Sequence, residues 1–387
     1  MDFRQIAVIG AGIGGLAAAA LLHRAGHAVT IFERFASPRA VGSGLVIQPV
    51  GLAVLDAVGA GDAARALGTP IARMVGHDGT RRVLSVAYRA DAPGLAMHRA
   101  SLFGVLWDVV QGLGLPVVTD AQVVGCPLVA GRRLVDLTDG RQGPFDLVVD
   151  AGGAGSVISP LQSRTLPFGA IWGHVPWPDG VPQMGELRQA YQGAARMAGI
   201  LPIGRLPDDA SPRAAVFWSM PVGELAGWAG CDIAAWKAEV TGLWPAMALF
   251  LEGITRTDQM TVARYAHGTL TRPYAQALVH IGDAAHRASP QLGQGANMAL
   301  LDAYALAQAL QHDDPLAVYA RMRRWHVRAY QAMSWAFTPM YQSHSRVLPA
   351  VRNHVLAPVA EWPVVLGVLT RLVSGDVIPP LAGVRFP

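Results

Sequence analysis

Four residues near the start of the chain have the types and the spacing needed to bind a dinucleotide. Gly10, Gly12 and Gly15 follow the pattern G-x-G-x-x-G, and Glu33 comes 18 residues after Gly15. In such a turn the first glycine allows a tight bend, the second lets a pyrophosphate approach the backbone, and the third lets a helix and a strand pack closely. A carboxylate at this distance can accept hydrogen bonds from a ribose diol. We therefore predict a dinucleotide site; the alternative is a glycine-rich turn without a ligand.

A second group of such residues lies about 250 residues further along the chain. Asp283 follows Gly282 at the end of an apolar run and offers a carboxylate to a sugar-like polyol. Ten residues later the turn Gly293-Gln294-Gly295 opens another apolar helix. The N-terminus of a helix carries partial positive charge, so it can face an electron-rich ring or an oxyanion.

The elements that position these residues can be read from the hydrophobic pattern. Residues 6–9, 28–32 and 277–281 are apolar, β-branched runs typical of strands buried on both faces of a parallel sheet. An Ala/Leu-rich helix is expected from about residue 16 to 24, and another from about residue 297 to 310. The N–H groups in the first turn of the helix at residues 16–24 have no partner within the helix, so the start of this helix can bind phosphates. The fold class is thus α/β, with a Rossmann-like nucleotide-binding domain.

The middle of the chain has a different pattern. Residues 164–272 alternate short strand-like runs with turns at Pro176, Pro178, Gly180 and Pro202, which predicts a mainly antiparallel β-sheet that forms a substrate domain. Residues 73–93 are expected to join it. The predicted domains are therefore 1–72, 94–163 and 273–387 for the cofactor, and 73–93 with 164–272 for the substrate. Residues 316–373 are expected to form C-terminal helices, broken at Pro339, Pro349, Pro358 and Pro363.

Composition narrows the function classes. Charged residues make up 15% of the chain and hydrophobic residues 52%, which excludes global disorder. No apolar stretch reaches the ~20 residues of a membrane-spanning helix. All basic residues except Lys237 are arginine, which indicates either phosphate and carboxylate recognition or the codon bias of a GC-rich genome. Four of the arginines lie close together, at positions 321, 323, 324 and 328. The sequence has no basic stripe with interleaved aromatic residues, so we do not expect it to bind nucleic acid.

The cysteines and the N-terminus point to the cytoplasm. Cys126 and Cys231 lie 105 residues apart, and the chain has no C-x-x-C pair or Cys/His cluster, so we expect neither bound metal nor a disulfide scaffold. The first residues lead into a strand without the apolar region of a signal peptide.

Several motifs together resemble the class A flavoprotein monooxygenases, the para-hydroxybenzoate hydroxylase-like group. Besides the first glycine turn, residues 42–49 are similar to that family's loop beside the flavin, and residues 98–102 to its Arg-x-x-Leu helix start. The block from Gly282 to Asp302 is the most specific match. The resemblance implies FAD as cofactor. Glu33 would hold the ribose, Arg34 and Arg99 would lie near the phosphates and the ribityl chain, and Asp283 would bind the ribityl chain. The full set of expected FAD-binding residues is Gly10, Gly12, Gly14, Gly15, Glu33, Arg34, Gly44, Arg99, Asp283, Pro290, Gly293, Gly295 and Asn297.

The same resemblance implies the activity. The expected reaction is hydroxylation of a small aromatic or related conjugated substrate by O2 through a flavin C4a-hydroperoxide, with NADPH or NADH as reductant. Such chemistry needs no metal and no protein nucleophile, and no catalytic base is assigned. Expected partners are the substrate and O2, in a monomer or homodimer without an integral membrane segment. Candidate pocket residues, each with core packing as the alternative role, are Trp172, His174, Tyr191, Trp218 and Met220.

One motif departs from the family pattern. The family's middle motif reads Gly-Ala-Asp-Gly with a later Ser and Arg, whereas this chain has Asp150 for the usual Gly, Gly152 for the usual Asp and Ser159 for the usual Arg. One interpretation is compensated drift, or Asp150 acting in place of the missing acid from two residues away. The other is an enzyme that is reduced poorly by NAD(P)H, by another donor or not at all, and it predicts a flavoenzyme of another reaction type, such as Baeyer–Villiger oxidation, dehydrogenation or cyclisation. A separate alternative is a non-catalytic flavin-binding protein.

Overall fold

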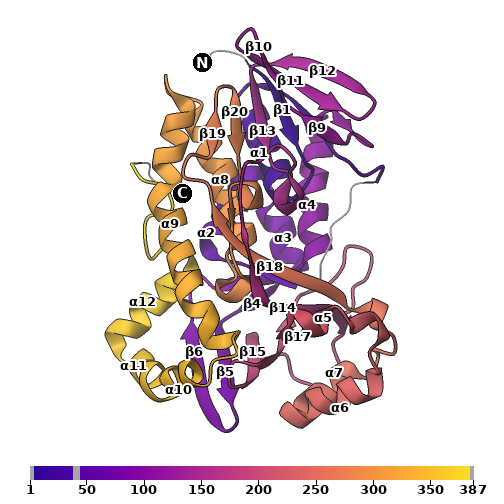
Figure 1. The fold of residues 1–387 in the computed structure, drawn as a ribbon, viewed down its shortest axis with the longest axis vertical. Helices are drawn as coiled ribbons and strands as arrows, with labels where there is room; N and C mark the ends of the chain where they lie inside the picture. Colours follow the sequence, from indigo (N-terminus) through magenta and orange to yellow (C-terminus); the bar gives the residue numbers. More distant parts are fainter. Residues whose placement is uncertain (1–3, 38–43, 384–387) are drawn as a thin grey trace.

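The computed structural model describes residues 4–37 and 44–383, and these form a mixed α/β architecture built around two large sheets (Figure 1). The first is a six-stranded sheet in the order β19-β20-β13-β1-β2-β8, parallel except for the antiparallel pair β19–β20. Its strands are β1 (Gln5–Ile9), β2 (Ala28–Phe32), β8 (Val117–Val118), β13 (Leu147–Asp150), β19 (Tyr274–Ala275) and β20 (Leu278–His280).

This parallel sheet is covered by apolar helices, as its buried strands require. Ile6, Ala7 and Val8 of β1 are fully buried, and six consecutive residues of α1, from Ala17 to Leu22, are almost as inaccessible. Helix α1 (Ile13–Arg24) packs on β1 and β2. The helices that extend the same apolar core are α2 (Pro49–Val58), α3 (Gly61–Leu67), α4 (Arg99–Gly112) and α8 (Gly295–Ala309). The expected strand–turn–helix–strand unit is present, with α1 starting three residues earlier than predicted.

The second large sheet has eight strands in the order β21-β18-β14-β17-β16-β15-β5-β6, and every neighbouring pair except β15–β5 is antiparallel. Its strands are β5 (Arg73–Asp78), β6 (Arg81–Ala87), β14 (Arg164–Pro176), β15 (Glu186–Gln192), β16 (Arg196–Pro202), β17 (Arg213–Pro221), β18 (Thr261–Thr269) and β21 (His286–Arg287). The predicted mainly antiparallel sheet is therefore confirmed, and β5 and β6 join it. The division of the chain at the expected domain boundaries stays a prediction.

Two smaller sheets complete the β-structure. One is β3-β7-β4, formed by β3 (Gly44–Ile47), β4 (Thr69–Ile71) and β7 (Gly94–His98). The other is formed by β9 (Val123–Gly125), β10 (Leu128–Val129), β11 (Arg132–Leu137) and β12 (Gly140–Phe145).

Three helices, α5 (Val222–Leu225), α6 (Ile233–Leu243) and α7 (Ala248–Leu251), cover one face of the eight-stranded sheet with a separate apolar core. The long helix α9 (Pro315–Tyr341) runs beside α8 and on toward the eight-stranded sheet, and short helices follow it (Figure 1). These are α10 (Val347–Val351), a π-helical turn over Arg352–Leu356, α11 (Ala357–Ala360) and α12 (Pro363–Ser374).

The predicted break at Pro339 is wrong, because α9 continues through it to Tyr341. A proline removes one backbone donor and crowds the carbonyl four residues earlier, and α9 ends two residues after Pro339. Pro349 likewise lies inside α10, whereas Pro363 begins α12 as expected.

Candidate functional site

The first glycine turn combines two close backbone contacts with one open surface. Gly10 has a φ of +97°, and a Cβ there would stand 2.7 Å from the Ala151 carbonyl oxygen. A Cβ on Gly15 would stand 1.9 Å from the Gly10 oxygen, so the fold itself requires glycine at both positions. Gly12, the N-cap of α1, has an ordinary φ of −78°, and a Cβ there would meet no atom of a described residue within 4 Å. Its glycine leaves the backbone open at the start of the helix.

Glu33 is held beside this turn. Its side chain is 8% exposed and accepts hydrogen bonds from the N–H groups of Ala11 (2.8 Å) and Phe35 (3.1 Å). A carboxylate has about four acceptor positions, so the two remaining ones can accept ligand hydroxyls. Arg34 and Arg99 are both exposed, and neither makes an ion pair with a described residue. The Arg34 guanidinium lies 3.5 Å from the place of a Cβ on Gly155, so it reaches the middle motif.

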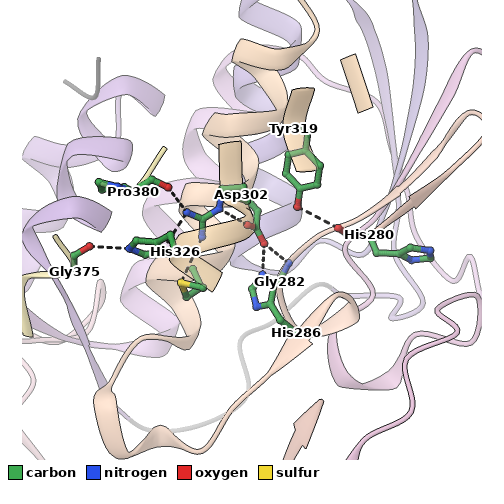
Figure 2. Close-up of polar contacts among 10 residues, drawn as sticks. His280, Gly282, His286, Asp302, Tyr319, His326, Gly375 and Pro380 are labelled. Atoms are coloured by element: carbon green, nitrogen blue, oxygen red, sulfur yellow. Dashed lines mark hydrogen bonds and ion pairs between the residues drawn. The ribbon is translucent and has the colours of Figure 1, made fainter. Parts of the chain in front are cut away.

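A buried carboxylate fixes the second glycine-acid segment (Figure 2). Asp302 of α8 is fully buried and accepts three hydrogen bonds: from the Gly282 N–H (2.9 Å), from His286 Nε2 (2.6 Å) and from Arg323 Nε (2.7 Å). Burial acts to raise the pKa of Asp302, but the charges and hydrogen bonds of His286 and Arg323 outweigh it and hold this pKa well below its usual range. Asp283, next to the anchored Gly282, is exposed and has no side-chain hydrogen bond to a described residue.

The network extends from Arg323 to the C-terminal segment. Arg323 donates to the Pro380 carbonyl (2.6 Å) and contacts His326 Nδ1 (3.3 Å), while His326 Nε2 contacts the Gly375 carbonyl (2.9 Å; Figure 2). Burial, together with the charge of Arg323, lowers the pKa of His326 to about 3, so His326 is neutral at pH 7. A neutral ring can donate from Nε2 and accept at Nδ1, which matches both contacts.

The turn before α8 is built around Asn297, which is fully buried. Its side-chain oxygen accepts from the Gln48 N–H (2.8 Å), and its nitrogen donates to the carbonyls of Val46 and Gly293 (both 3.1 Å). Asn297 therefore ties β3 to the start of α8, and Gly293 takes the left-handed conformation there, with a φ of +63°. Pro290 opens the short helical turn that leads to Gly293, and Gly295 begins α8 with open space at its Cβ position.

Two buried amide atoms beside this turn, Gln48 Nε2 and Gln294 Oε1, have no hydrogen-bond partner among the described residues. Gln48 Nε2 lies 3.4 Å from the place of a Cβ on Gly293. Buried polar groups are normally paired. One unpaired donor and one unpaired acceptor therefore fit the polar edge of a flavin ring.

The remaining expected FAD residues are also placed. Gly14 packs against α8, since its Cβ would stand 3.1 Å from Ala299 Cβ, and Gly44 begins β3 close to Ile203. Gly42 and Ser43, part of the loop that resembles the family's flavin loop, lie outside the described residues. No role was predicted from the sequence for Asp302, Arg323, Gln48 or Gln294. The available signal was that Asp302, Gln48 and Gln294 lie inside the quoted motifs and Arg323 in the group of four arginines.

The altered middle motif is organised by Asp150, which is fully buried at the end of β13. Its carboxylate accepts from the Gly152 N–H (3.0 Å) and Ser156 Oγ (2.7 Å) and contacts His280 Nδ1 (2.7 Å). Asp150 therefore joins the middle motif to β20, which leads into Gly282 and Asp283.

The five candidate pocket residues do not share one surface. Trp218 and Met220 pack on the face of the eight-stranded sheet that α5, α6 and α7 cover. Trp172 and Tyr191 belong to the cluster on the opposite face, where Trp172 donates to the Tyr265 hydroxyl (2.7 Å) and Tyr191 packs against Tyr341. His174 lies with its ring 4.6 Å from that of His98 and its Nδ1 3.2 Å from an Arg213 nitrogen.

Residues 4–37 and 44–383 contain no group of three His, Cys, Asp or Glu side chains placed to hold a metal ion. None of the helices described is long and apolar enough to cross a membrane by itself, although Val347–Ala360 and Pro363–Ser374, bent by 104°, pass the length and composition test as a pair.

Comparison with known proteins agrees with this geometry. Residues 4–110 and 241–329, half of the chain, match the profile of a family described as FAD binding domain. The chain is 28% identical over 367 residues to the probable 2-heptyl-3-hydroxy-4(1H)-quinolone synthase of Rhodococcus erythropolis, covering 87% of this chain and 88% of that protein. It is also 28% identical over 341 residues to the 3-amino-4-hydroxybenzoate 2-monooxygenase of Streptomyces cremeus, covering 79% and 78%.

Solved structures share the whole fold. A Klebsiella pneumoniae protein crystallised with FAD and uric acid superposes with a TM-score of 0.81 at 20% identity, over 97% of this chain and 98% of that chain. A 2-methyl-3-hydroxypyridine-5-carboxylic acid oxygenase gives 0.78 at 21%, over 96% and 97%. The chain belongs to the FAD-binding family that its profile match names, as a class A monooxygenase of the aromatic hydroxylase type.

The first prediction concerns His98, the N-cap of α4, whose Nδ1 accepts from the Ala100 N–H (3.0 Å). Burial, with the nearby His174 and Arg213, lowers the pKa of His98 from its usual 6.5 to about 4. In the unfolded chain His98 has its usual pKa and is protonated more readily than in the folded protein. The contribution of His98 to the free energy of unfolding is therefore unchanged above pH 6.5 and falls by roughly 2–3 kcal/mol as the pH falls toward 4.

In His98→Asn, the cap is kept by a side chain that does not titrate. Urea unfolding at pH 7 and pH 4.5 should therefore show a smaller loss of unfolding free energy for the variant than for the wild type. Equal losses in the two proteins would contradict the assignment.

Proposed function

We propose that the protein hydroxylates a small aromatic or related conjugated substrate with O2 through the C4a-hydroperoxide of bound FAD, using NADPH or NADH as reductant. The observation that carries the proposal is the open backbone at Gly12 beside the fixed carboxylate of Glu33, in a chain of this family. In this account the chain's own residues bind and orient the cofactor and exclude water.

The phosphate end of the site rests on the first turn. The N–H groups at the start of α1 have no acceptor within the helix and face the open side of Gly12, so they can donate to a pyrophosphate. Glu33 uses its two free acceptor positions for the adenosine ribose. Arg34 and Arg99, which pair with no carboxylate among the described residues, contribute positive charge at the phosphates and the ribityl chain.

The flavin end rests on the second segment. Asp283 accepts hydrogen bonds from ribityl hydroxyls, and its position follows from the anchored N–H of Gly282. The positive end of α8 at Gly295 stabilises negative charge on the ring, while Gln48 Nε2 and Gln294 Oε1 supply a donor and an acceptor.

The substrate side is assigned to the face of the eight-stranded sheet that carries Trp172 and Phe217, whose rings stack with centroids 4.4 Å apart. Aromatic side chains offer apolar faces for a planar substrate and keep water away from the reaction. Asp78 of β5 pairs with Tyr191 across the strands on this face, but its carboxylate is bound by Arg352 (2.6 Å), and no general base is proposed.

The prediction for the activity is that oxygen from O2 enters the product. With a panel of substrates such as 3-amino-4-hydroxybenzoate, alkylquinolones and urate, NADPH or NADH oxidation should rise with one member. Mass spectrometry after reaction under isotopically labelled O2 should then find one labelled oxygen in the product. If all the O2 consumed is released as hydrogen peroxide with every substrate, and no oxygen enters a product, the proposal is contradicted.

The altered middle motif decides between the proposal and a flavoenzyme with little use of NAD(P)H. Asp150 already binds Gly152, Ser156 and His280, which supports the interpretation that it organises this motif in place of the missing acid. The two candidates differ in stopped-flow mixing of the anaerobic holoprotein with NADPH or NADH. Loss of the visible absorbance of oxidised flavin within the turnover time supports the proposal, and no loss with either nucleotide favours the alternative.

The assignment of the phosphate site is tested with Gly12→Ala. The φ of Gly12 suits alanine and no atom opposes the new methyl group, so the FAD-free variant should unfold with nearly the wild-type free energy. The methyl group would occupy the surface offered to the pyrophosphate, and we expect the Kd for FAD to rise at least about tenfold, the effect of losing one strong hydrogen bond.

A matched control is Gly112→Ala at the end of α4, where a Cβ also meets nothing within 4 Å. Fluorescence titration of the apoproteins with FAD measures both affinities. If Gly12→Ala binds FAD as tightly as Gly112→Ala does, the pyrophosphate does not lie at Gly12.

A further inference from the structure

A second charged site lies outside the residues assigned to FAD. A cavity of about 330 Å³ opens between α9 and the segment that leads from β18 into β19. Five arginines line it, namely Arg272, Arg321, Arg323, Arg324 and Arg328, together with the hydroxyl-bearing Thr269 and Thr271. No aspartate or glutamate is among the lining residues, so the charge of the cavity is strongly positive.

Four of these arginines have no counter-charge within the part of the chain that the structure describes. Arg323 pairs with the buried Asp302, but the other four are exposed and form no ion pair with any residue in the described ranges. Arg321, Arg324 and Arg328 are spaced three and four residues apart, so they lie on one face of α9, where like charges destabilise a helix. A cluster of this kind is stabilised when an anion joins it.

Aromatic rings, rather than carboxylates, support the guanidinium groups. Arg272 lies 4.4 Å from the centre of the Tyr274 ring, and Arg324 and Arg328 lie 5.1 and 5.6 Å from that of Trp325. Stacking of this kind fixes the side chain while leaving its N–H groups free to bind a ligand.

We propose that this cavity binds a phosphate-bearing anion with two or more negative charges. Guanidinium groups bind phosphate through paired hydrogen bonds, and the two threonine hydroxyls can donate further ones. The volume lies at the lower end of the range for small-molecule sites, which suits a pyrophosphate or the phosphate part of a nucleotide rather than a whole dinucleotide.

The floor of the cavity is also the back of the flavin segment. Its lining includes His286, which contacts Asp302 (2.6 Å), and Tyr319, whose hydroxyl donates to the His280 carbonyl (3.3 Å; Figure 2). Asp302 in turn accepts from the N–H of Gly282. An anion in the cavity would therefore lie one layer of side chains from the Gly282–Asp283 turn, which makes the phosphates of NADPH one source of the ligand and a free phosphate compound the other.

The test is calorimetric titration of the FAD-loaded protein with inorganic pyrophosphate. The wild type should bind it saturably, and Arg272→Gln and Arg321→Gln should each weaken binding about three- to tenfold, the range for one exposed charge-assisted hydrogen bond. The triple variant Arg321→Gln/Arg324→Gln/Arg328→Gln should lose binding. The control Arg346→Gln removes an exposed arginine before α10, outside the cavity, and should change the Kd by less than about twofold.

Two results would overturn the proposal: no saturable binding by the wild type at about 1 mM pyrophosphate, or equal binding by the wild type and the triple variant. All the exchanged arginines are exposed, and circular dichroism verifies that the variants are folded. Because heat is measured without turnover, this outcome is independent of whether hydroxylation occurs.

Competition identifies the source of the phosphate. Displacement of pyrophosphate by NADPH but not by NADH assigns the cavity to the 2′-phosphate, and equal displacement by both assigns it to their shared pyrophosphate. Displacement by ATP alone assigns it to a nucleotide other than the reductant.

Discussion

The buried carboxylate of Asp302 is the contact on which the other parts of the site depend. From α8 it holds two other segments through hydrogen bonds: the turn with the Gly282 N–H and His286, and α9 with Arg323. A buried charge is tolerated only when it is fully paired, and removing one partner of such a pair typically costs about 3–5 kcal/mol. The positions of α8, α9 and the Gly282 turn are therefore fixed together, and Arg323 extends the constraint to the Pro380 carbonyl.

From this centre the two halves of the proposed FAD site are held at a fixed separation. Gly14, at the start of α1, packs directly on Ala299 near the start of α8, so the phosphate turn is attached to the helix that the ring turn opens. Asn297 then attaches β3 to the start of α8. These segments also carry the polar groups that have no partner among the described residues. They are the side-chain atoms of Gln48, Gln294 and Asp283 and the two remaining acceptor positions of the Glu33 carboxylate. Because the hydrogen bonds that hold these segments in place are already made within the protein, the unpaired groups are available to bind the ligand.

Local patterns in the sequence predicted the parallel sheet, the first glycine turn and the mainly antiparallel second sheet, because strand and helix periodicity and glycine spacing are local properties. Contacts across the chain were not predictable in this way: Asp302 and Arg323 are ordinary charged residues on helices until the fold brings them together. Strand alternation separates Trp218 from Phe217, but the sequence does not say which face meets α5–α7, so Trp172 and Trp218 were grouped although they lie on opposite faces. The helix through Pro339 likewise depends on tertiary packing of α9.

The most direct test of this account is the Kd for FAD and the unfolding free energy of Asp302→Asn, measured on the same preparation. An amide at this position keeps the shape but removes the charge that pairs with Arg323. We expect a folded protein that has lost several kcal/mol of stability and binds FAD at least about tenfold more weakly, because the Gly282–Asp283 turn has lost its anchor. Wild-type stability together with wild-type affinity for FAD would contradict it.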